Sequence, residues 1–194
     1  MTSIAELPDP PSPNGKEVLV PTTRAVWREW LASNHERPDG LWVVYRKKSS
    51  KLDGPLYVDL VDEALCFGWI DSLTRRVDED RLIQWYSPRR PGGLWSAPNK
   101  ARIERLRAEG LMTTAGQIAI DRAQADGSWS QADAVDALVV PADLAEAMDA
   151  APQAKAAYEA LSDSEKKQIL WSIYSAKRDP TRAARIERVV DRLS

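Results

Sequence analysis

Cysteine and histidine are almost absent from this chain, which has one of each, Cys66 and His35, in 194 residues. A single cysteine excludes an internal disulfide bond, and a chain of this length does not need one. The same inventory excludes a zinc site built from several cysteines and histidines. We therefore expect no metal site, and no motif in the sequence calls for a cofactor.

Long apolar runs are also missing. No stretch approaches the ~18 apolar residues of a membrane-spanning helix. The first residues, up to Pro10, lack the basic and apolar regions of a signal peptide. The sequence therefore predicts a soluble, cytoplasmic protein without a membrane span.

Catalytic motifs are missing too. The sequence contains no Gly-x-Ser-x-Gly nucleophile elbow and no Gly-x-x-x-x-Gly-Lys-Ser/Thr phosphate loop. His35 follows Asn34 at the expected end of a helix, where a capping role fits better than catalysis. Cys66 lies in an apolar stretch and is interpreted as buried filler. Whether the protein is an enzyme stays open at this point.

The sequence nevertheless predicts a real hydrophobic core, because 43% of the residues are hydrophobic and 29% are charged. We expect an α+β fold, with a small antiparallel sheet packed against two helices and a helical C-terminal half. Three regions follow from the composition. Residues 1–21 are a proline-rich, flexible lead-in, residues 22–110 the α+β core, and residues 111–194 a helical region packed on it.

The α+β core is predicted from periodicity. Thr22 or Thr23 can cap a helix whose apolar side chains recur at helical spacing, and a second helix follows from about residue 58 to 67. Strands are predicted at 41–45, 69–77 and 81–86, the last two forming a hairpin, with a possible short strand at 18–20. On a regular strand, alternate residues from Trp69 to Val77, Asp71 among them, would share one face.

The helical half is predicted from caps and breakers. Ser96 can cap a helix that ends before Gly110, and further helices are expected near 115–125, 141–148 and 152–161. The run Ser162–Glu165 has the spacing of a capping box and predicts a helix to about residue 177. A last helix is expected at 181–193.

Charge is unevenly distributed along the chain, although its net value is only −2. Residues 81–107 hold seven Lys/Arg against one acid, 121–165 hold ten acids against two cations, and 166–194 hold eight Lys/Arg against three acids. Such asymmetry can indicate an anionic partner, or oppositely charged segments that pack together or face water. The low net charge argues against a nucleic-acid binder.

Carboxylates gather around the junction of the second helix and the next strand. Glu63 comes one helical turn after Asp59, and Asp71 lies on a strand with apolar neighbours. Such a carboxylate either pairs with a cation or acquires a raised pKa. The group is therefore a candidate for general acid–base work, or else for ion pairs with Arg75, Arg89 or Arg90.

Arg89 and Arg90 lie between two prolines and just before two glycines. Arginine forks suit carboxylates and phosphates, and a helix N-terminus adds a positive dipole. Together with Ser96, Asn99 and Lys100 they predict an anion site. Trp69 is expected in the core, like most of the tryptophans, whereas Trp95 follows Gly93 and Leu94 in a polar loop and could line a pocket.

Several short blocks of the chain resemble one known family. The run Leu65-Cys66-Phe67-Gly68-Trp69-Ile70-Asp71 is similar to a characteristic block of the YdeI/OmpD-associated, bacteriocin-protection-like proteins. Further matches, in order, are Trp30-Leu31, Gly40-Leu41-Trp42, Pro88-Arg89-Arg90, Trp95-Ser96, Gly110-Leu111-Met112, Asp126-Gly127-Ser128-Trp129, Leu170-Trp171-Ser172-Ile173 and Thr181-Arg182. The resemblance covers about residues 23–193.

The resemblance implies a small bacterial stress or protection protein, in a family linked to an outer-membrane porin and with no established reaction. Its recurrent polar positions correspond here to Lys47, Glu63, Asp71, Arg89, Ser96, Asn99, Lys177 and Arg182. Direct contact with a porin is not expected, because the N-terminus offers no export signal. With the residues chosen above, the candidate ligand-binding set is Lys47, Glu63, Trp69, Asp71, Arg89, Arg90, Trp95, Ser96, Asn99, Lys177 and Arg182.

Three functions remain. The first is a non-enzymatic protein that binds a small anionic ligand or a protein partner through a surface lined by Trp, Arg and Asp. The second is an enzyme for a small anionic substrate, with Arg89 or Arg90 gripping it and Asp71 or Glu63 moving a proton. The third is nucleic-acid binding through residues 81–107, where aromatic side chains could stack on bases.

Overall fold

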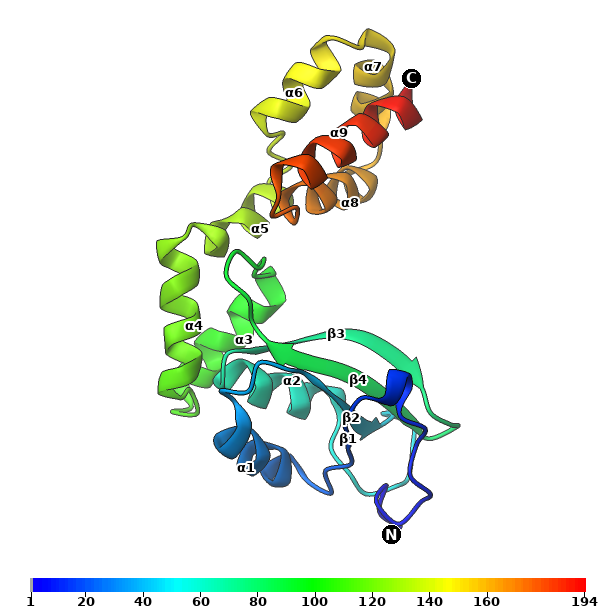
Figure 1. Ribbon diagram of the computed structural model, residues 1–194, viewed down its shortest axis with the longest axis vertical. Helices are drawn as coiled ribbons and strands as arrows, with labels where there is room; N and C mark the ends of the chain where they lie inside the picture. Colours follow the sequence, from blue (N-terminus) through cyan, green and yellow to red (C-terminus); the bar gives the residue numbers. More distant parts are fainter. Residues whose placement is uncertain (1) are drawn as a thin grey trace. The chain divides into compact units, whose positions relative to one another are not determined.

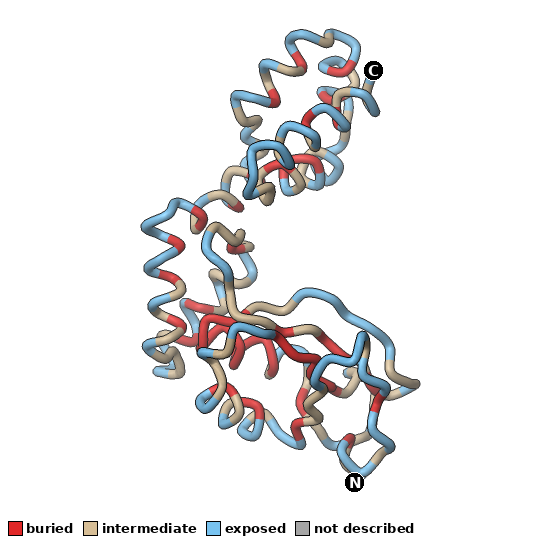
Figure 2. Tube along the Cα trace, viewed as in Figure 1, coloured by how far each residue is buried: buried red, intermediate tan, exposed pale blue. Residues whose placement is uncertain are grey.

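The computed structural model describes residues 2–194 and divides into two compact units (Figure 1). The first unit comprises Met1–Arg90 and Asn99–Arg122, and the second comprises Pro91–Pro98 and Ala123–Ser194. Each unit has its own hydrophobic core, as the buried residues in Figure 2 show. The α+β class expected from the sequence is confirmed, since the sheet lies in the first unit and the second is helical.

A four-stranded sheet organises the first unit. Its strands are β1 (Val18–Leu19), β2 (Leu41–Arg46), β3 (Trp69–Arg76) and β4 (Arg81–Pro88), in the order β1-β2-β4-β3. Strands β2, β4 and β3 are antiparallel, as expected, whereas β1 joins β2 in parallel. The sheet is therefore mixed, which corrects the expectation of a purely antiparallel one.

Helices α1 (Arg24–Asn34) and α2 (Tyr57–Cys66) cover one face of the sheet. Thr23 Oγ1 accepts a hydrogen bond from the backbone N–H of Val26, so the predicted cap is confirmed. The ring of Trp27 lies 5.5 Å from that of Tyr86 on β4 and 6.4 Å from that of Trp69 on β3. Aromatic packing between α1 and the sheet thus accounts for much of this core.

The other face of the sheet is covered by the N-terminal segment. Ile4 is fully buried and forms a cluster with Trp42, Val44 and Ile83. The backbone N–H of Ile4 donates to the carbonyl oxygen of Asp53 at 2.9 Å. Because both faces of the sheet are covered, the side chains of β2 are apolar on both faces and do not alternate between apolar and polar.

The predicted face of β3 is interrupted by a register shift between Asp71 and Thr74. Asp71 lies opposite Tyr86, on the helix-covered face, and after the shift Thr74 lies opposite Gln84 on that same face. Arg75 is on the other face, where its guanidinium lies 5.3 Å from the ring centroid of Trp42. The expectation that alternate residues from Trp69 to Val77 share one face is therefore wrong, because a bulge reverses the alternation.

Two further helices follow the sheet, α3 (Ala97–Ala108) and α4 (Thr114–Ala125), which lie mainly in the first unit. Helix α4 packs closely on the turn between α2 and β3. A Cβ atom on Gly116 would lie 2.7 Å from the carbonyl carbon of Cys66, and one on Gly68 would lie 2.9 Å from Cβ of Ala119. Two glycines therefore set how closely α4 approaches this turn.

The second unit is a bundle of short helices. They are α5 (Ser128–Asp136), α6 (Ala142–Asp149), α7 (Pro152–Ala160), α8 (Asp163–Tyr174) and α9 (Asp179–Leu193). Leu144, Leu170 and Ile173 are fully buried in their common core. The capping box at Ser162 and Glu165 is confirmed, whereas α5 was not expected from the sequence.

Within residues 2–194, no helix is long and apolar enough to cross a membrane. Over the same residues, no three His, Cys, Asp or Glu side chains come close enough together to hold a metal ion.

Candidate functional site

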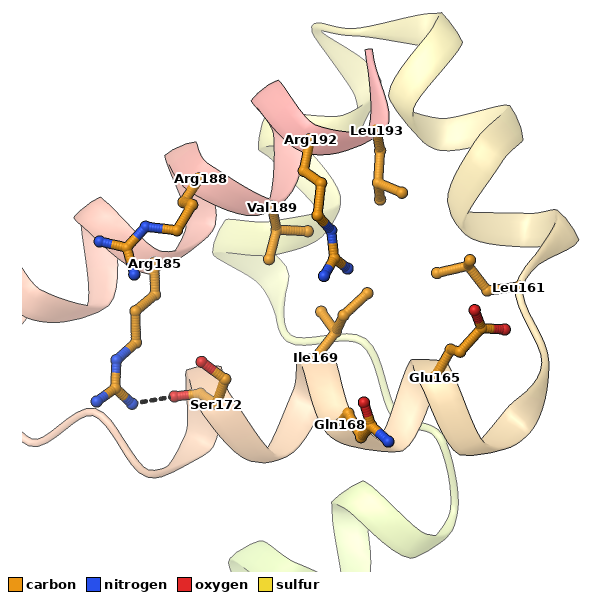
Figure 3. A pocket seen from close by; sticks show the side chains of 10 residues that line it. All are labelled: Leu161, Glu165, Gln168, Ile169, Ser172, Arg185, Arg188, Val189, Arg192 and Leu193. Carbon is orange, nitrogen blue, oxygen red and sulfur yellow. Dashed lines mark hydrogen bonds between the residues drawn. The ribbon is translucent and has the colours of Figure 1, made fainter.

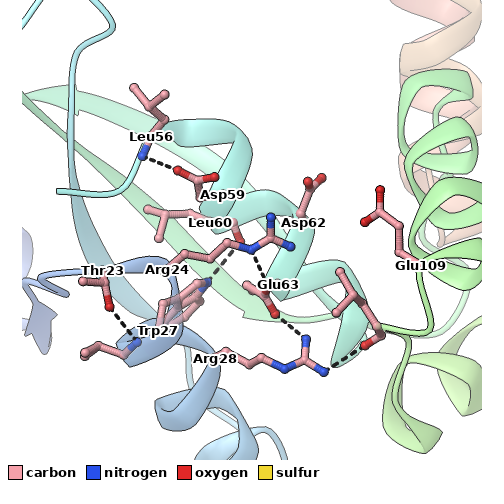
Figure 4. Close-up of polar contacts among 12 residues, drawn as sticks. Thr23, Arg24, Trp27, Arg28, Leu56, Asp59, Leu60, Asp62, Glu63 and Glu109 are labelled. Atoms are coloured by element: carbon pink, nitrogen blue, oxygen red, sulfur yellow. Dashed lines mark hydrogen bonds and ion pairs between the residues drawn. The ribbon is translucent and has the colours of Figure 1, made fainter.

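Glu63 is held in a buried ion-pair network in the first unit (Figure 4). Its side chain is 2% exposed, and its carboxylate accepts hydrogen bonds from Arg24 Nε and Arg28 Nη1, both at 2.5 Å. Arg28 also donates to the carbonyl oxygen of Leu111 at 2.9 Å. Two guanidinium groups stabilise the charged carboxylate, so Glu63 ties α1 to α2 rather than facing a ligand.

Asp62 has a similar arrangement that the sequence did not reveal. It is 4% exposed, and its two carboxylate oxygens accept hydrogen bonds from Arg102 at 3.2 Å and Arg105 at 2.5 Å. These contacts join α2 to α3 across forty residues of sequence. Asp62 and Glu63 are therefore paired with arginines within the fold, whereas Asp59 caps α2 by accepting a hydrogen bond from the backbone N–H of Leu56 at 2.8 Å.

Asp71 lies on the helix-covered face of the sheet, away from the Glu63 network. Its Oδ2 accepts hydrogen bonds from the hydroxyl of Tyr57 at 2.9 Å and from Nε2 of Gln84 at 3.1 Å. Burial, followed by the charge of Asp71, raises the pKa of Tyr57 to about 12. Tyr57 thus remains a neutral hydrogen-bond donor, and Asp71 has two donors that are not arginines.

Arg89 follows β4 and is anchored beside the turn that precedes β3. Its backbone N–H donates to the carbonyl oxygen of Gly68 at 2.9 Å. Its Nε and Nη2 atoms are buried. Burial lowers the pKa of Arg89 to about 9, an effect that the charge of Asp71 partly offsets. The guanidinium group is therefore still charged at neutral pH, in a place where positive charge is poorly solvated.

Arg89 lines a pocket of about 560 Å³ along α4, called here the α4 pocket. Its other walls are the end of α1 (His35 and Glu36), the turn at Phe67 and Gly68, and one side of α4 (Thr114, Ala115, Ile118, Ala119 and Arg122). Arg122 and Ile118 are exposed, the latter by 52%. The pocket combines two arginines with apolar walls and a single carboxylate, that of Glu36.

The other candidates in the first unit do not line this pocket. Nζ of Lys47 donates to the carbonyl oxygens of Asp78 and Glu79, at 3.0 and 2.6 Å, and so holds the β3–β4 turn. Trp69 is fully buried, and its Nε1 donates to the carbonyl oxygen of His35 at 3.0 Å. Arg90 is exposed, and Asn99 lies in the first turn of α3.

The remaining candidates belong to the second unit. Trp95 is 2% exposed, with its ring centroid 5.2 Å from that of Trp129, and it therefore packs as core. Ser96 directly precedes α3, as predicted. The backbone N–H of Gly92 donates to Asp126 at 3.0 Å, which fixes the start of this loop.

Lys177 and Arg182 come together in the second unit, at a pocket of about 460 Å³ that Gly92 also lines. Both cations already have internal partners. Nζ of Lys177 donates to the carbonyl oxygen of Pro91 at 2.6 Å. Arg182 forms a bidentate salt bridge with Asp143, at 2.5 and 2.9 Å, and donates a third hydrogen bond to the carbonyl oxygen of Ile173. These contacts connect α6, α8 and α9.

A second hollow in this unit involves none of the predicted residues. It is a groove of about 490 Å³ between α8 and α9, called here the α8–α9 groove (Figure 3). Arg185, Arg188 and Arg192 line it from α9, and Ile169 and Ser172 from α8. The spacing of the three arginines is visible in the sequence. The groove could not be predicted, because the sequence does not show which face of α9 is buried.

Cys66 does not supply a reactive thiol. It is fully buried, and burial followed by the charge of Glu63 raises its pKa to about 11. A neutral, inaccessible thiol is a poor nucleophile, which agrees with the predicted role as core filler.

Two family models match the chain. One, described as a domain of unknown function, DUF8412, matches residues 19–119, just over half of the sequence. The other, described as bacteriocin-protection, YdeI or OmpD-associated, matches residues 137–194. The α4 pocket falls almost entirely within the first match, and the α8–α9 groove lies wholly within the second.

No curated protein and no solved structure matches the chain. The family resemblance of the sequence is confirmed by the C-terminal match, whereas residues 19–119 are described by a separate family model. The chain belongs to the DUF8412 family, whose model matches just over half of it, and its residues 137–194 match the model of the bacteriocin-protection, YdeI or OmpD-associated family.

Proposed function

We propose that the first unit binds a small organic anion in the α4 pocket. The observation that carries this proposal is the position of Arg89, whose buried guanidinium nitrogens lie at a pocket of about 560 Å³ that it shares with exposed Arg122. A pocket of this size suits a metabolite-sized ligand. Arginine forks recognise carboxylate and phosphate groups.

Electrostatics supports an anion over a neutral ligand. Arg89 and Arg122 bring two positive charges to the pocket, against the single carboxylate of Glu36. This excess of positive charge favours a ligand that carries a carboxylate or phosphate group. The apolar side chains of Phe67 and Ile118 would meet the ligand's carbon skeleton.

Binding fits the geometry better than proton transfer does. The enzyme alternative requires Arg89 or Arg90 to converge with Asp71 or Glu63 at one pocket. Of these four, only Arg89 lines the α4 pocket. Both carboxylate oxygens of Glu63 are occupied by Arg24 and Arg28, so the side chain does not reach this pocket.

Nucleic-acid binding through residues 81–107 has less support, because most of that positive charge is neutralised internally. Arg81 pairs with Asp78, Arg102 and Arg105 pair with Asp62, and Arg107 pairs with Glu104. A phosphate backbone would have to displace these contacts. Ligand binding is therefore the function that we place first.

In the cell, we propose that this binding belongs to a stress or protection role in the cytoplasm. The description of the C-terminal family as bacteriocin-protection supports such a role. Exported partners such as a porin are not part of the proposal.

Thermal-shift assays and isothermal titration calorimetry of the purified protein with small carboxylates and phosphorylated metabolites would test the α4 pocket. A ligand at about 100 times its dissociation constant should stabilise the protein by about 2.7 kcal/mol. This stabilisation should disappear in Arg89→Gln and Arg122→Gln. Arg90→Gln is the matched control, because Arg90 is the exposed neighbour of Arg89 and does not line the pocket.

Two results would contradict the proposal. One is a bound anion whose affinity is unchanged in Arg122→Gln, a variant that should fold normally because Arg122 is exposed. The other is a panel of anions with no binder at up to about 1 mM. Binding that both pocket variants retain but Arg90→Gln loses would show that the anion binds at Arg90, outside the α4 pocket.

A further inference from the structure

Three arginines, Arg185, Arg188 and Arg192, line the α8–α9 groove together with one carboxylate, that of Glu165. Arg188 and Arg192 are exposed and form no hydrogen bond or salt bridge with any residue in the range 2–194. Other cations of the second unit are paired, since Lys155 contacts Asp149, Lys167 contacts Asp136 and Arg182 contacts Asp143. Three cations of this unit are thus paired with carboxylates elsewhere, whereas Arg188 and Arg192 lie next to one another along the groove.

Arg185, Arg188 and Arg192 lie on one side of α9, because residues three, four and seven apart share a helix face. Figure 3 shows Arg192 reaching across the groove toward α8 and Arg185 reaching Ser172. Arg185 donates to the carbonyl oxygen of Ser172 and to Oγ of Ser175, so its position is fixed. Two exposed guanidinium groups therefore follow one anchored group along α9.

One acidic residue, Glu165, faces the three arginines across the groove. Its Oε2 accepts hydrogen bonds from the backbone N–H of Ser162 at 2.9 Å and from the Ser162 hydroxyl at 2.6 Å, which cap α8. These hydrogen bonds lower the pKa of Glu165, and the charge of Arg192 adds to that effect. The groove keeps an excess of positive charge.

The floor and ends of the groove are apolar. Ile169 of α8 and Val189 of α9 are buried at its base, and Leu161 and Leu193 line its end. The apolar floor beside a row of arginines matches a ligand with one apolar side and one acidic side. A simple inorganic anion would leave the apolar part unused.

The spacing of the charges distinguishes a peptide from a small anion. Seven residues of α9 separate Arg185 from Arg192, a rise of about 10 Å. One carboxylate cannot contact groups along that length, whereas acidic residues three or four apart on a helix can. Helix-in-groove recognition uses this arrangement of apolar anchors and matching charges.

We propose that the α8–α9 groove binds an acidic, amphipathic helical segment of a partner protein. Carboxylates on one side of that segment pair with Arg188 and Arg192, and its apolar side covers Ile169 and Val189. This interaction is independent of the α4 pocket, because the groove lies wholly in the second unit. The proposal assigns the C-terminal family domain a role in protein recognition.

The probe is a synthetic helical peptide of about four turns, with Glu at positions i, i+4 and i+7 and Leu on the adjoining face. Its binding to the full chain is measured by fluorescence anisotropy at low and high salt. The matched peptide carries Gln in place of Glu. We expect a dissociation constant in the micromolar range, weakened at least about tenfold by the Gln peptide and by high salt.

The protein variants are the double change Arg188→Gln/Arg192→Gln and the control Arg178→Gln. Arg178 is an exposed arginine of the same unit that does not line the groove. We expect the double variant to lose at least about tenfold in peptide affinity, while the control binds like the natural protein. Circular dichroism should show both variants folded, since all three side chains are exposed.

Each other outcome overturns the proposal in a specific way. Equal binding by the double variant would show that the peptide binds outside the groove. Equal binding of the Gln peptide would show that the carboxylates of the peptide do not contribute to its affinity. Competition by free glutarate at the peptide's own affinity makes the occupant a small anion. A dimer in sedimentation that the double variant abolishes makes it a second copy of this chain. No peptide binding at about 1 mM rejects the groove as a docking site.

Discussion

The two units of this chain treat charged side chains in opposite ways. The first unit buries carboxylates at helix–helix contacts, with Asp62 and Glu63 each held between two arginines. The second unit has an apolar core and keeps its ion pairs on the surface. Charge in the first unit therefore joins its helices, whereas Arg188 and Arg192 of the second unit are exposed and form no hydrogen bond or salt bridge within residues 2–194.

This difference changes how a charged residue in a sequence should be interpreted. Polar positions that recur in a family are often assumed to form a site. Here Glu63 and Lys47 act within the fold, and the exposed arginines of the α8–α9 groove, Arg188 and Arg192, were not among the recurrent positions. Availability for binding depends on which partners the fold supplies, and that information is not local in the sequence.

The largest effect should come from the apolar core of the second unit. Leu170→Ala removes a fully buried side chain, and we expect the free energy of unfolding to fall by about 4 kcal/mol. Urea denaturation followed by circular dichroism measures this change. Val139→Ala, at a half-exposed position of the same unit, should cost little. A loss below about 1 kcal/mol for Leu170→Ala would mean that the helices are not held by this core.

The buried carboxylate of the first unit should come next. Glu63→Gln leaves Arg24 and Arg28 without their shared anion, and removal of one partner from a buried pair costs about 3 kcal/mol. We expect the lower end of the usual range, because each arginine is about one-third exposed and can turn to water. Chemical denaturation would show the loss. Glu109→Gln, which breaks an exposed pair with Arg105, should change stability by less than about 0.5 kcal/mol.

A third change tests the close packing of α4. Alanine normally stabilises a helix relative to glycine by about 1 kcal/mol. At Gly116, however, the added methyl group would meet the carbonyl group of Cys66, so we expect Gly116→Ala to destabilise the protein by about 2 kcal/mol. Thermal unfolding gives the sign directly. Gln124→Ala on the same helix is exposed and should be neutral, and a stabilised Gly116→Ala variant would show that α4 can move away from the turn.

The smallest effect should come from a surface ion pair of the second unit. Hydrogen bonding to Arg182 is the main reason that the pKa of Asp143 is lowered. A lowered pKa means that the pair stabilises the fold above the unfolded-state value of about 3.9 and loses that effect as the pH falls below it. Asp143 is 45% exposed, so Asp143→Asn should cost less than about 1 kcal/mol at pH 7.

The pH dependence gives this prediction its control. The difference between Asp143→Asn and the natural protein should shrink as the pH falls from 7 through the lowered pKa of Asp143, because the natural carboxyl is then protonated as well. A series of urea titrations from neutral to acidic pH measures it. A difference that persists at low pH would show that the amide disturbs the packing of α6 rather than an ion pair.

Local signals in the sequence predicted much of the fold. Thr23 and Ser162 start their helices as expected, and the β3–β4 hairpin forms where the turn residues place it. These features depend on neighbours within a few residues, which is why the sequence reveals them. The parallel pairing of β1, the bulge in β3 and the short helix α5 were not predicted, because each depends on packing against distant segments.

The candidate site was less predictable than the fold. Arg89 was chosen from its prolines and glycines, and the structure places it at a pocket. The rest of that pocket comes from α1 and α4, whose approach to Gly68 no local pattern encodes. The sequence composition changes near residue 110, whereas the contacts of the chain pass from the first unit to the second at Arg122. The domain boundary at residue 110 stays a prediction.

The two glycines under α4 also have a kinetic consequence. With no side chain at Gly68 or Gly116, the helix rests on backbone and on one alanine methyl, and no flexible layer lets it slide or roll. A ligand of the α4 pocket would thus meet walls that are already in place. Its association should be a single step, with an observed rate that rises linearly with ligand concentration and shows no plateau from a preceding conformational change.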